Sequence, residues 1–528
     1  MDRPLPTRLL EISGDSYETR LIEPAPSSTG KYIALSHCWG KMKLLRTLKD
    51  NFNDHLTSIP FSTLPLTFQH AVQVTALLGY RYLWIDSLCI KQDDREDWEV
   101  ECSRMQDNYE NAAVVIAGPG AASSAAGFYR PRVQPPLPPV RLAGNNSGGE
   151  IVLISLSAAS SAHHQRRPPR EKASPLHTRG WILQERLLAP RVLYIGTTQV
   201  YFECKQCLFF ESSWRPIDAG RTASEIDSKF VLDLHCNSDA ERYYRWYRVV
   251  RTFTACQLTH TSDTLPALSG LARRCAALLS DRYLAGLWEK DILHGLIWHL
   301  ATPIAGRLPQ YRAPSWSWAS VDFEVGFDLA VYLHDIRQAK TAPLVEISHA
   351  ATEALGLDTF GEVSSGYIVL VGSLIPITVL SASSTTSTPG PTAKPRLIVC
   401  VHGHRIANFF PDYSHQLSPL SPSALEPTSK STTVHSIFFL PLLHSKTGSV
   451  LKFCGLAVQR LPEAEEEREN EGGGEEQRIA GAREKYIRLG LIHATRAPSR
   501  CECADKNGED GVHGMPWVAY PKREIVLL

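Results

Sequence analysis

The sequence has no surplus of charge of either sign and no long apolar run. Lysine plus arginine and aspartate plus glutamate both total 55 among 528 residues, so the formal net charge is +0 at pH 7. A chain without a dominant field is not expected to attract nucleic acid or anionic lipid. No stretch approaches the ~18 apolar residues of a membrane span, and residues 1–20 lack the apolar core of a signal peptide. We therefore expect a soluble, cytoplasmic protein with no nucleic-acid partner and no membrane span.

Phosphate-loop and metal-site motifs are also missing. No GxGxxG follows an apolar strand and no GxxxxGK[ST] occurs, which disfavours a Rossmann dinucleotide site and a nucleoside-triphosphatase loop. The 12 cysteines are scattered along the chain, so a disulfide framework is not expected. Cys204 and Cys207 form a CxxC, and Cys501, Cys503 and His513 could supply further zinc ligands, but that second half lacks the usual CxxC spacing. We expect no bound metal.

Composition divides the chain into four segments. A length of 528 residues suggests roughly three to four compact units, and Pro-rich or polar stretches mark their limits. We predict a leader over 1–28, an α/β domain over 29–215 with a loop-rich insertion at 129–175, a helical region over 216–325 that ends in a Trp-rich segment, and a β-rich region over 326–528 with disordered insertions.

The α/β assignment depends on alternating patterns. Short apolar runs at about 32–36, 82–86 and 113–117 predict strands, and longer amphipathic stretches between them predict helices, the first of them ending at Gly79. Strands that are apolar throughout and alternate with helices are typical of a parallel sheet covered on both faces. In the helical region, Trp316 and Trp318 would share one face if their segment is a strand, and we expect both to pack against the α/β domain or the helical part and to tie the two together.

Polar residues follow the first two predicted strands. Ser36 ends the first strand and Trp39 follows it, whereas Asp86 ends the second strand and Ser87 follows directly. Ligands bind at the carboxyl ends of parallel strands because loops and helix N-termini converge there, so these residues are candidate substrate-binding groups. The alternative is that Ser36 and Asp86 only cap turns.

A second candidate site lies on the acidic helix predicted over 94–112. At ~100° per residue, one apolar stripe contains Trp98, Cys102, Met105 and Tyr109. Asp94 and Asp97 have the spacing of a capping box, which explains those two acids, but Glu101 lies about 60° from the stripe without such a reason.

A carboxylate at the margin of an apolar face is partly desolvated, which raises its pKa and suits a general base. We therefore single out Glu101 as the candidate catalytic residue, with Trp98 beside it in the candidate binding set. The alternative is a structural ion pair between Glu101 and Arg104 or another arginine.

An Arg-Gly-Trp corner provides two further candidates. Arg179 could neutralise a phosphate, and Trp181 could stack on a base or a sugar. The alternative is that Trp181 fills the core while Arg179 pairs with an acid such as Glu185.

Three segments together resemble one known family. They are "YIALSHCWG", then "LPLTFQHAVQVTALLGYRYLWIDSLCIKQDDREDWEVECSRMQDNYENAAVVIAG", then "TRGWILQERLLAPRVLYIG". In this order they look like the three motifs of the fungal heterokaryon-incompatibility (HET) domain and cover roughly residues 31 to 196. "LPALSGLA", "YLAGLW" and "YRAPSWSWAS" look like segments that often follow this domain, which extends the resemblance to about residue 322.

The resemblance implies a role in fungal non-self recognition and programmed cell death, and a fold distantly related to TIR domains. Some TIR domains cleave NAD with a glutamate that commonly lies four residues after a tryptophan, whereas Trp98 and Glu101 are three apart. It therefore implies two readings. In one, the domain assembles and acts as an NAD glycohydrolase, for which NAD is a substrate rather than a bound cofactor. Glu101 would be its essential carboxylate, and Ser36, Asp86 and Arg179 would shape the pocket. In the other, it is a non-enzymatic interaction module that acts by self-association, with a second copy or another incompatibility protein as partner.

Overall fold

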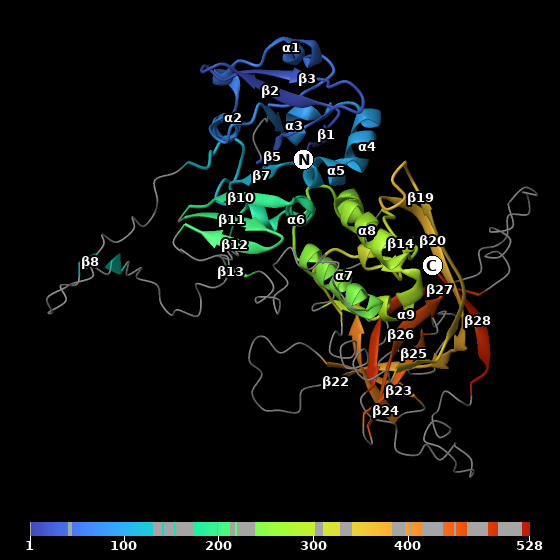
Figure 1. Ribbon diagram of the computed structural model, residues 1–528. Helices are drawn as coiled ribbons and strands as arrows, with labels where there is room; N and C mark the ends of the chain where they lie inside the picture. The colour runs from blue at the N-terminus through green and yellow to red at the C-terminus, as the bar shows by residue number, and fades with distance from the viewer. Residues whose placement is uncertain are drawn as a thin grey trace, which may run out of the picture. The chain divides into compact units, whose positions relative to one another are not determined.

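The structure is a computed structural model that separates into two compact units. It describes residues 2–40, 45–129, 140–141, 153–154, 174–197, 199–211, 217–218, 238–300, 310–327, 341–382, 396–401, 404–412, 437–447, 450–461, 484–494 and 520–528. Unit 1 consists of Met1–Asp233 and Cys256–Thr259, and unit 2 of Leu234–Ala255 and His260–Leu528 (Figure 1). Within the described residues, no helix combines the length and the apolarity needed to cross a bilayer.

A nine-stranded sheet forms the centre of unit 1. In spatial order its strands are β13 (Ile217–Asp218), β12 (Cys207–Phe210), β11 (Val200–Cys204), β10 (Arg191–Ile195), β7 (Val114–Ala117), β5 (Ile33–Ser36), β6 (Tyr82–Trp84), β2 (Leu9–Ser13) and β3 (Glu18–Ile22). The segment 1–28, which composition sets apart as a leader, thus contributes β2 and β3 to this sheet. It also contains β1 (Arg3–Pro4), which pairs with β4 (Thr29–Gly30).

The middle of this sheet is parallel, as the alternating pattern predicts. β5 pairs in parallel with β6 on one side and with β7 on the other, and β10 continues the parallel order beyond β7. Ile33 on β5, Leu83 on β6 and Ile116 on β7 are fully buried. Strands that are apolar throughout are expected where both faces of a sheet are covered.

The predicted parallel pairing of these three strands is confirmed, but the sheet as a whole is mixed. β2 pairs antiparallel with both β3 and β6, and β10, β11, β12 and β13 form an antiparallel meander at the other edge. Short connections explain this difference. The turn from β2 to β3 contains Gly14 and Tyr17, both with positive φ, and a turn this short cannot make the crossover of a dozen or more residues that a parallel pair needs.

Six α-helices of unit 1 lie among the described residues: α1 (Phe52–Thr57), α2 (Leu66–Leu77), α3 (Asp86–Cys89), α4 (Arg95–Ser103), α5 (Met105–Glu110) and α6 (Gly180–Leu188). Single 3₁₀ turns lie at Phe61–Thr63 and Leu176–Thr178. After α2, Gly79 takes φ 78° and its N–H donates to the Ala76 carbonyl, while the Tyr80 N–H donates to the Thr75 carbonyl. These two bonds form a Schellman motif, so the predicted end of this helix is correct.

The acidic helix predicted over 94–112 is in fact two helices. Arg104 separates α4 from α5 with φ −95° and ψ −2°. Asp94 is the N-cap of α4, as the spacing predicts, but the capping box is incomplete because the backbone N–H of Asp94 donates to the Lys91 carbonyl and not to Asp97. Asp97 instead pairs with Arg8.

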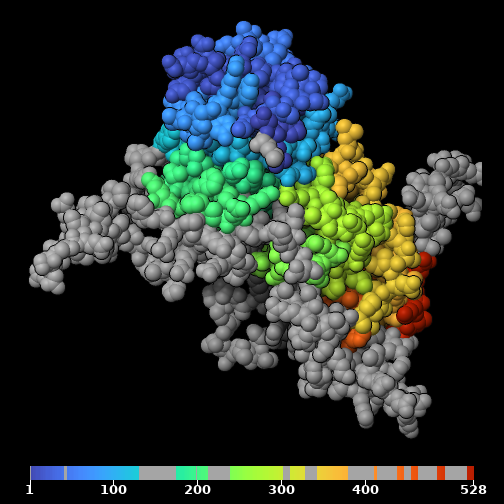
Figure 2. Space-filling view, in the orientation of Figure 1, coloured from blue at the N-terminus to red at the C-terminus, as the bar shows by residue number. Residues whose placement is uncertain are grey.

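On the face shown in Figure 2, the N-terminal segments of unit 1 form one closely packed body.

Unit 2 begins with helices, as predicted for the middle of the chain. α7 (Asp239–Thr254) and α8 (Pro266–Leu279) are followed by the short α9 (Ile292–Gly295) and by single 3₁₀ turns at Thr261–Thr264, Glu289–Asp291 and Trp318–Ser320. Two small antiparallel pairs complete this part. They are β14 (Tyr283–Leu284) with β15 (Leu287–Trp288), and β16 (Trp298–Leu300) with β17 (Val325–Phe327).

The rest of unit 2 is an eleven-stranded sheet, which confirms the predicted β-rich region. Its strands are β18 (Thr341–Pro343), β19 (Glu346–Ala354), β20 (Val363–Ser373), β21 (Ile375–Pro376), β22 (Thr378–Ala382), β23 (Arg396–Val401), β24 (His404–Pro411), β25 (Ile437–Thr447), β26 (Val450–Arg460), β27 (Lys485–Ala494) and β28 (Lys522–Leu527). The predicted insertions of this region lie outside the described residues. So does most of the insertion at 129–175, apart from the pair β8 (Val140–Arg141) and β9 (Leu153–Ile154).

The two tryptophans of the Trp-rich segment are buried in unit 2. Trp316 and Trp318 both have 0% exposure, and the Trp318 ring packs edge-on against Phe253 of α7, so the predicted packing against the helical part is confirmed for Trp318. The predicted tie to the α/β domain stays a prediction. The two residues do not lie on a strand, because Trp318 begins a 3₁₀ turn. The indole of Trp318 donates to the Gly286 carbonyl at 3.0 Å, and the indole of Trp246 donates to the same oxygen at 2.9 Å. One backbone carbonyl thus anchors two buried indoles.

Gly286→Ala is expected to destabilise unit 2 by about 2 kcal/mol or more. Gly286 has φ +101°, a region that side chains with a Cβ rarely adopt, and its added Cβ would lie 2.4 Å from Nε1 of Trp318. Backbone strain and overpacking each cost about 1–3 kcal/mol. Thermal unfolding measures the loss. Gly356→Ala is the control, since nothing lies within 4 Å of its Cβ position, and equal melting of the two variants would contradict this prediction.

Candidate functional site

The ends of β5 and β6 bring one group of polar residues together. Asp86 is the first residue of α3, directly after β6, and one of its carboxylate oxygens accepts a hydrogen bond from Nε1 of Trp39 at 2.8 Å. The other oxygen accepts from the backbone N–H of Ser87 and lies 3.7 Å from Nδ1 of His37. The side chain of Asp86 remains 18% exposed. The sequence-predicted residues at these two strand ends therefore do meet.

The N-terminal end of α6 adds a cation and a second acid to this group. Arg179 immediately precedes α6, and its guanidinium donates to the His37 carbonyl at 3.2 Å. Glu185 lies one turn into α6 and is 5% exposed. We call the whole group the Asp86 cluster: Ser36, His37, Cys38, Trp39, Asp86, Ser87, Tyr109, Arg179 and Glu185.

Burial shifts the ionisation of three members of the cluster. It raises the pKa of Glu185 to about 7, with a smaller contribution from the negative charge of Asp86, while Ser36 and Arg179 oppose the rise. Burial also lowers the pKa of His37 to about 4, so its imidazole is neutral at neutral pH. The pKa of the Cys38 thiol is raised by the same cause, although Arg179 opposes the rise. The cluster thus combines a neutral imidazole, a thiol and an acid that titrates near neutrality.

Several buried polar atoms of the cluster make no hydrogen bond to the described part of the chain. They are both ring nitrogens of His37, the Ser87 hydroxyl and Oε2 of Glu185. Buried polar groups are nearly always paired, because an unpaired one costs about 1–3 kcal/mol. Three side chains with such atoms, beside one partly exposed carboxylate at the ends of parallel strands, make the cluster the candidate ligand site.

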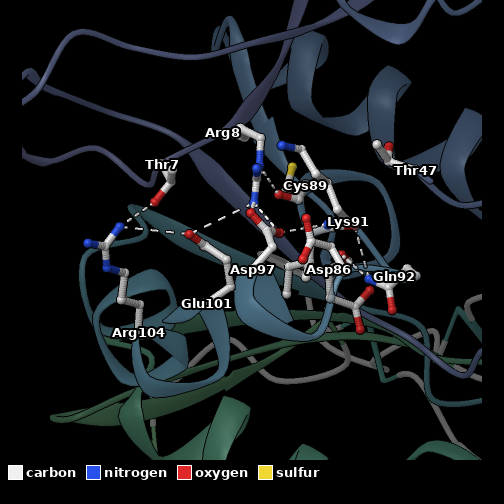
Figure 3. Close-up of polar contacts among 12 residues, drawn as sticks. Thr7, Arg8, Thr47, Asp86, Cys89, Lys91, Gln92, Asp97, Glu101 and Arg104 are labelled. Atoms are coloured by element: carbon white, nitrogen blue, oxygen red, sulfur yellow. Dashed lines mark hydrogen bonds and ion pairs between the residues drawn. The ribbon is translucent and has the colours of Figure 1, made fainter. Parts of the chain in front are cut away.

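Glu101 has a different environment, which Figure 3 shows. Its side chain is 2% exposed, and Oε1 lies 3.9 Å from Arg8 and 3.7 Å from Arg104. Arg8 is itself buried, donates to the Cys89 carbonyl at 2.7 Å and holds both oxygens of Asp97 at 2.6 and 2.7 Å. Thr7 accepts a hydrogen bond from Arg104. Glu101 thus belongs to an ion-pair network that joins α4 to the segment before β2.

Burial raises the pKa of Glu101, as its position beside the stripe predicts, and the nearby Thr7 and Arg8 oppose the rise. The arginine partners that the structural alternative requires are present. The catalytic role of Glu101 therefore stays a prediction with a well-supported structural competitor. Trp98 lies on the same helix, and its indole makes no hydrogen bond to the Asp86 cluster within the described residues. Trp181 is half-buried on the first turn of α6.

Glu185 was not among the predicted site residues and appeared only as an ion-pair partner for Arg179. The sequence around Glu185 does indicate that its carboxylate is buried. Trp181 and Leu188 lie four residues before it and three after it, so this acid shares a helical face with two large apolar residues. That position predicts burial of a carboxylate, but the sequence does not reveal that Asp86 would lie nearby.

Glu101→Gln is expected to lower the free energy of unfolding by about 1–3 kcal/mol, because a buried carboxylate between Arg8 and Arg104 is lost. Glu99→Gln is the matched control. Glu99 lies two residues away, and in the described part of the chain its ion pair is with Arg95, whose side chain is 84% exposed, so about 0.5 kcal/mol or less is expected. Thermal melting of both variants measures the difference. A Glu101→Gln protein that melts like the wild type would contradict the ion-pair role.

The CxxC pair lies on the β11–β12 hairpin. The sulfurs of Cys204 and Cys207 are 3.6 Å apart. The further ligands considered for zinc, which are Cys501, Cys503 and His513, lie outside the described residues. The structure therefore does not test that combination.

Comparisons with known proteins support the resemblance to the heterokaryon-incompatibility domain. Residues 32–185 match the family model described as "Heterokaryon incompatibility protein (HET)". The chain is also similar to "Heterokaryon incompatibility protein 6, OR allele" of Neurospora crassa, with 34% identity over 115 residues. This match covers 20% of the chain and only 16% of that relative. No solved structure matches. The matched segment contains β5, β6, β7 and most of α6, and so every residue of the Asp86 cluster; residues 32–185 of this chain are a heterokaryon incompatibility domain.

Proposed function

We propose that this chain is an incompatibility-type effector of fungal non-self recognition and programmed cell death, and that its HET domain hydrolyses NAD at the Asp86 cluster. The HET match and the name of the Neurospora relative support the first part. The observation that carries the second part is the set of buried polar atoms without a hydrogen-bond partner among the described residues, beside Asp86 and at the carboxyl ends of parallel strands.

The proposed reaction breaks the bond between nicotinamide and C1′ of ribose. Nicotinamide departs with the bonding electrons as a neutral molecule, and water adds to C1′ and loses one proton, so NAD and water give ADP-ribose, nicotinamide and a proton. Positive charge develops on the ribose in the transition state. The carboxylate of Asp86 would stabilise that charge, and Arg179 would balance a phosphate of the substrate.

The full-length chain incubated with NAD is expected to release free nicotinamide, measured by chromatography over time. The assay is run at several protein concentrations, because the resemblance to TIR domains implies that the enzyme is active as an assembly of several copies. Absence of nicotinamide at every concentration would refute the hydrolase and favour the non-enzymatic module. Expression of the chain in a fungal host, with NAD levels measured, tests the proposed role in programmed cell death.

A further inference from the structure

The Asp86 cluster contains one group that changes its charge in the physiological pH range. Glu185 faces Asp86 on α3, Arg179 before α6, Tyr109 on α5 and the Ser36–Cys38 segment after β5. Burial keeps the pKa of His37 at about 4, and it raises the pKa values of Cys38 and Tyr109. These three side chains therefore keep one protonation state between pH 6 and pH 8, whereas Glu185 does not.

Geometry indicates what Glu185 is available to bind. Its Oε2 makes no hydrogen bond to the described residues although the side chain is 5% exposed. The Ser87 hydroxyl and the neutral ring of His37 offer further unpaired donors and acceptors next to Asp86. The half-buried indole of Trp39 adds a flat apolar surface that Asp86 holds in place. Hydrogen-bonding groups of both kinds beside an aromatic ring suit a ligand rich in hydroxyl groups, such as a sugar.

We propose that a ribosyl ligand binds the Asp86 cluster in the ionised state of Glu185, whose carboxylate accepts hydrogen bonds from the ribose hydroxyls. This inference rests on the proposed function for its choice of ligand. An ionised carboxylate accepts stronger hydrogen bonds than its protonated form, which must donate with one of its oxygens. Protonation of Glu185 therefore weakens binding, and affinity rises with pH until the group is fully ionised.

The direct test is calorimetric titration of the full-length chain with ADP-ribose at pH 6, 7 and 8. A group with a pKa of about 7 is roughly one-tenth ionised at pH 6 and nine-tenths at pH 8, so the affinity is expected to rise about tenfold. Glu185→Gln is expected to bind weakly and without this pH dependence. No binding to the wild type, or an unchanged pH dependence in Glu185→Gln, would overturn the proposal.

Burial raises the pKa of Glu101 as well, so the Glu101→Gln variant is needed to show which of the two buried carboxylates causes the pH dependence. This variant is expected to keep the tenfold rise, and loss of the rise here would transfer the role to Glu101 and overturn the proposal. Failure of the hydrolase remains distinguishable, because a chain that binds ADP-ribose with the expected pH dependence but releases no nicotinamide would refute only the reaction.

Melting temperatures test the titration of Glu185 without any ligand. Because its folded-state pKa is raised above the ordinary value of 4.5, the folded protein binds the proton more tightly, and this stabilisation is lost as pH rises from about 4.5 to about 7. Glu185→Gln does not titrate. The difference in melting temperature, Glu185→Gln minus wild type, is therefore expected to increase from pH 5 to pH 8. A difference that stays constant over this range would overturn the assigned titration.

Discussion

Asp86→Asn is expected to lower the rate of nicotinamide release from NAD by about a hundredfold or more. The substitution keeps the size of the side chain and removes the charge that we propose to face the ribose, and loss of a carboxylate that acts directly in the reaction typically costs about 10²–10⁴ in rate. Some loss of stability is also expected, because the amide cannot accept from both Trp39 and the Ser87 backbone as the carboxylate does. The measurement is nicotinamide release by the full-length variant beside its thermal melting.

Asp54→Asn is the matched control for this experiment. Asp54 is an exposed residue of α1, outside the Asp86 cluster, and removal of its charge changes the net charge of the chain by the same amount. Its rate is expected to equal that of the wild type. A folded Asp86→Asn protein that releases nicotinamide at the wild-type rate would exclude Asp86 from the reaction and leave only the binding role of the cluster.

Arg488→Met is expected to destabilise unit 2 by about 3–5 kcal/mol, which is the usual cost of removing one partner of a buried ion pair. Arg488 on β27 is fully buried, and its Nε lies 2.9 Å from Asp412, whose side chain is 2% exposed. Arg488 also donates to the carbonyls of Leu296 and Trp298, and its guanidinium lies 3.5 Å from the centre of the Trp298 ring. The substitution leaves a buried carboxylate and two carbonyls without this donor.

Two further variants separate charge from packing in this network. Asp412→Leu added to Arg488→Met removes the isolated carboxylate and is expected to recover part of the lost stability. Arg251→Met is the exposed control, since Arg251 and Glu324 are 46% and 51% exposed and 3.5 Å apart, and its effect is expected within about 1 kcal/mol. Chemical unfolding of all variants measures these differences. Equal effects of Arg488→Met and Arg251→Met would show that the buried pair contributes little.

The site residues illustrate which features of a sequence are informative. The positions of Ser36, Trp39, Asp86 and Ser87 at one edge of the sheet were predictable, because apolar runs locate the ends of the parallel strands. Their role in binding stays a prediction. The angular position of Glu101 correctly predicted burial and a raised pKa. It did not reveal Arg8, which lies more than ninety positions earlier and reaches the carboxylate only through the fold.

By itself the sequence determined the family, the central strands and helices of unit 1, and the β-rich character of the C-terminal region. These features follow from local periodicity and from motifs that are contiguous in the chain. Only the tertiary structure decided the mixed pairing of the sheet, the break at Arg104 and the position of Glu185 near Asp86. The physical reason is that strand direction, burial and electrostatic neighbours depend on contacts between distant segments, so the burial of Glu185 near Asp86 could not be inferred from the sequence.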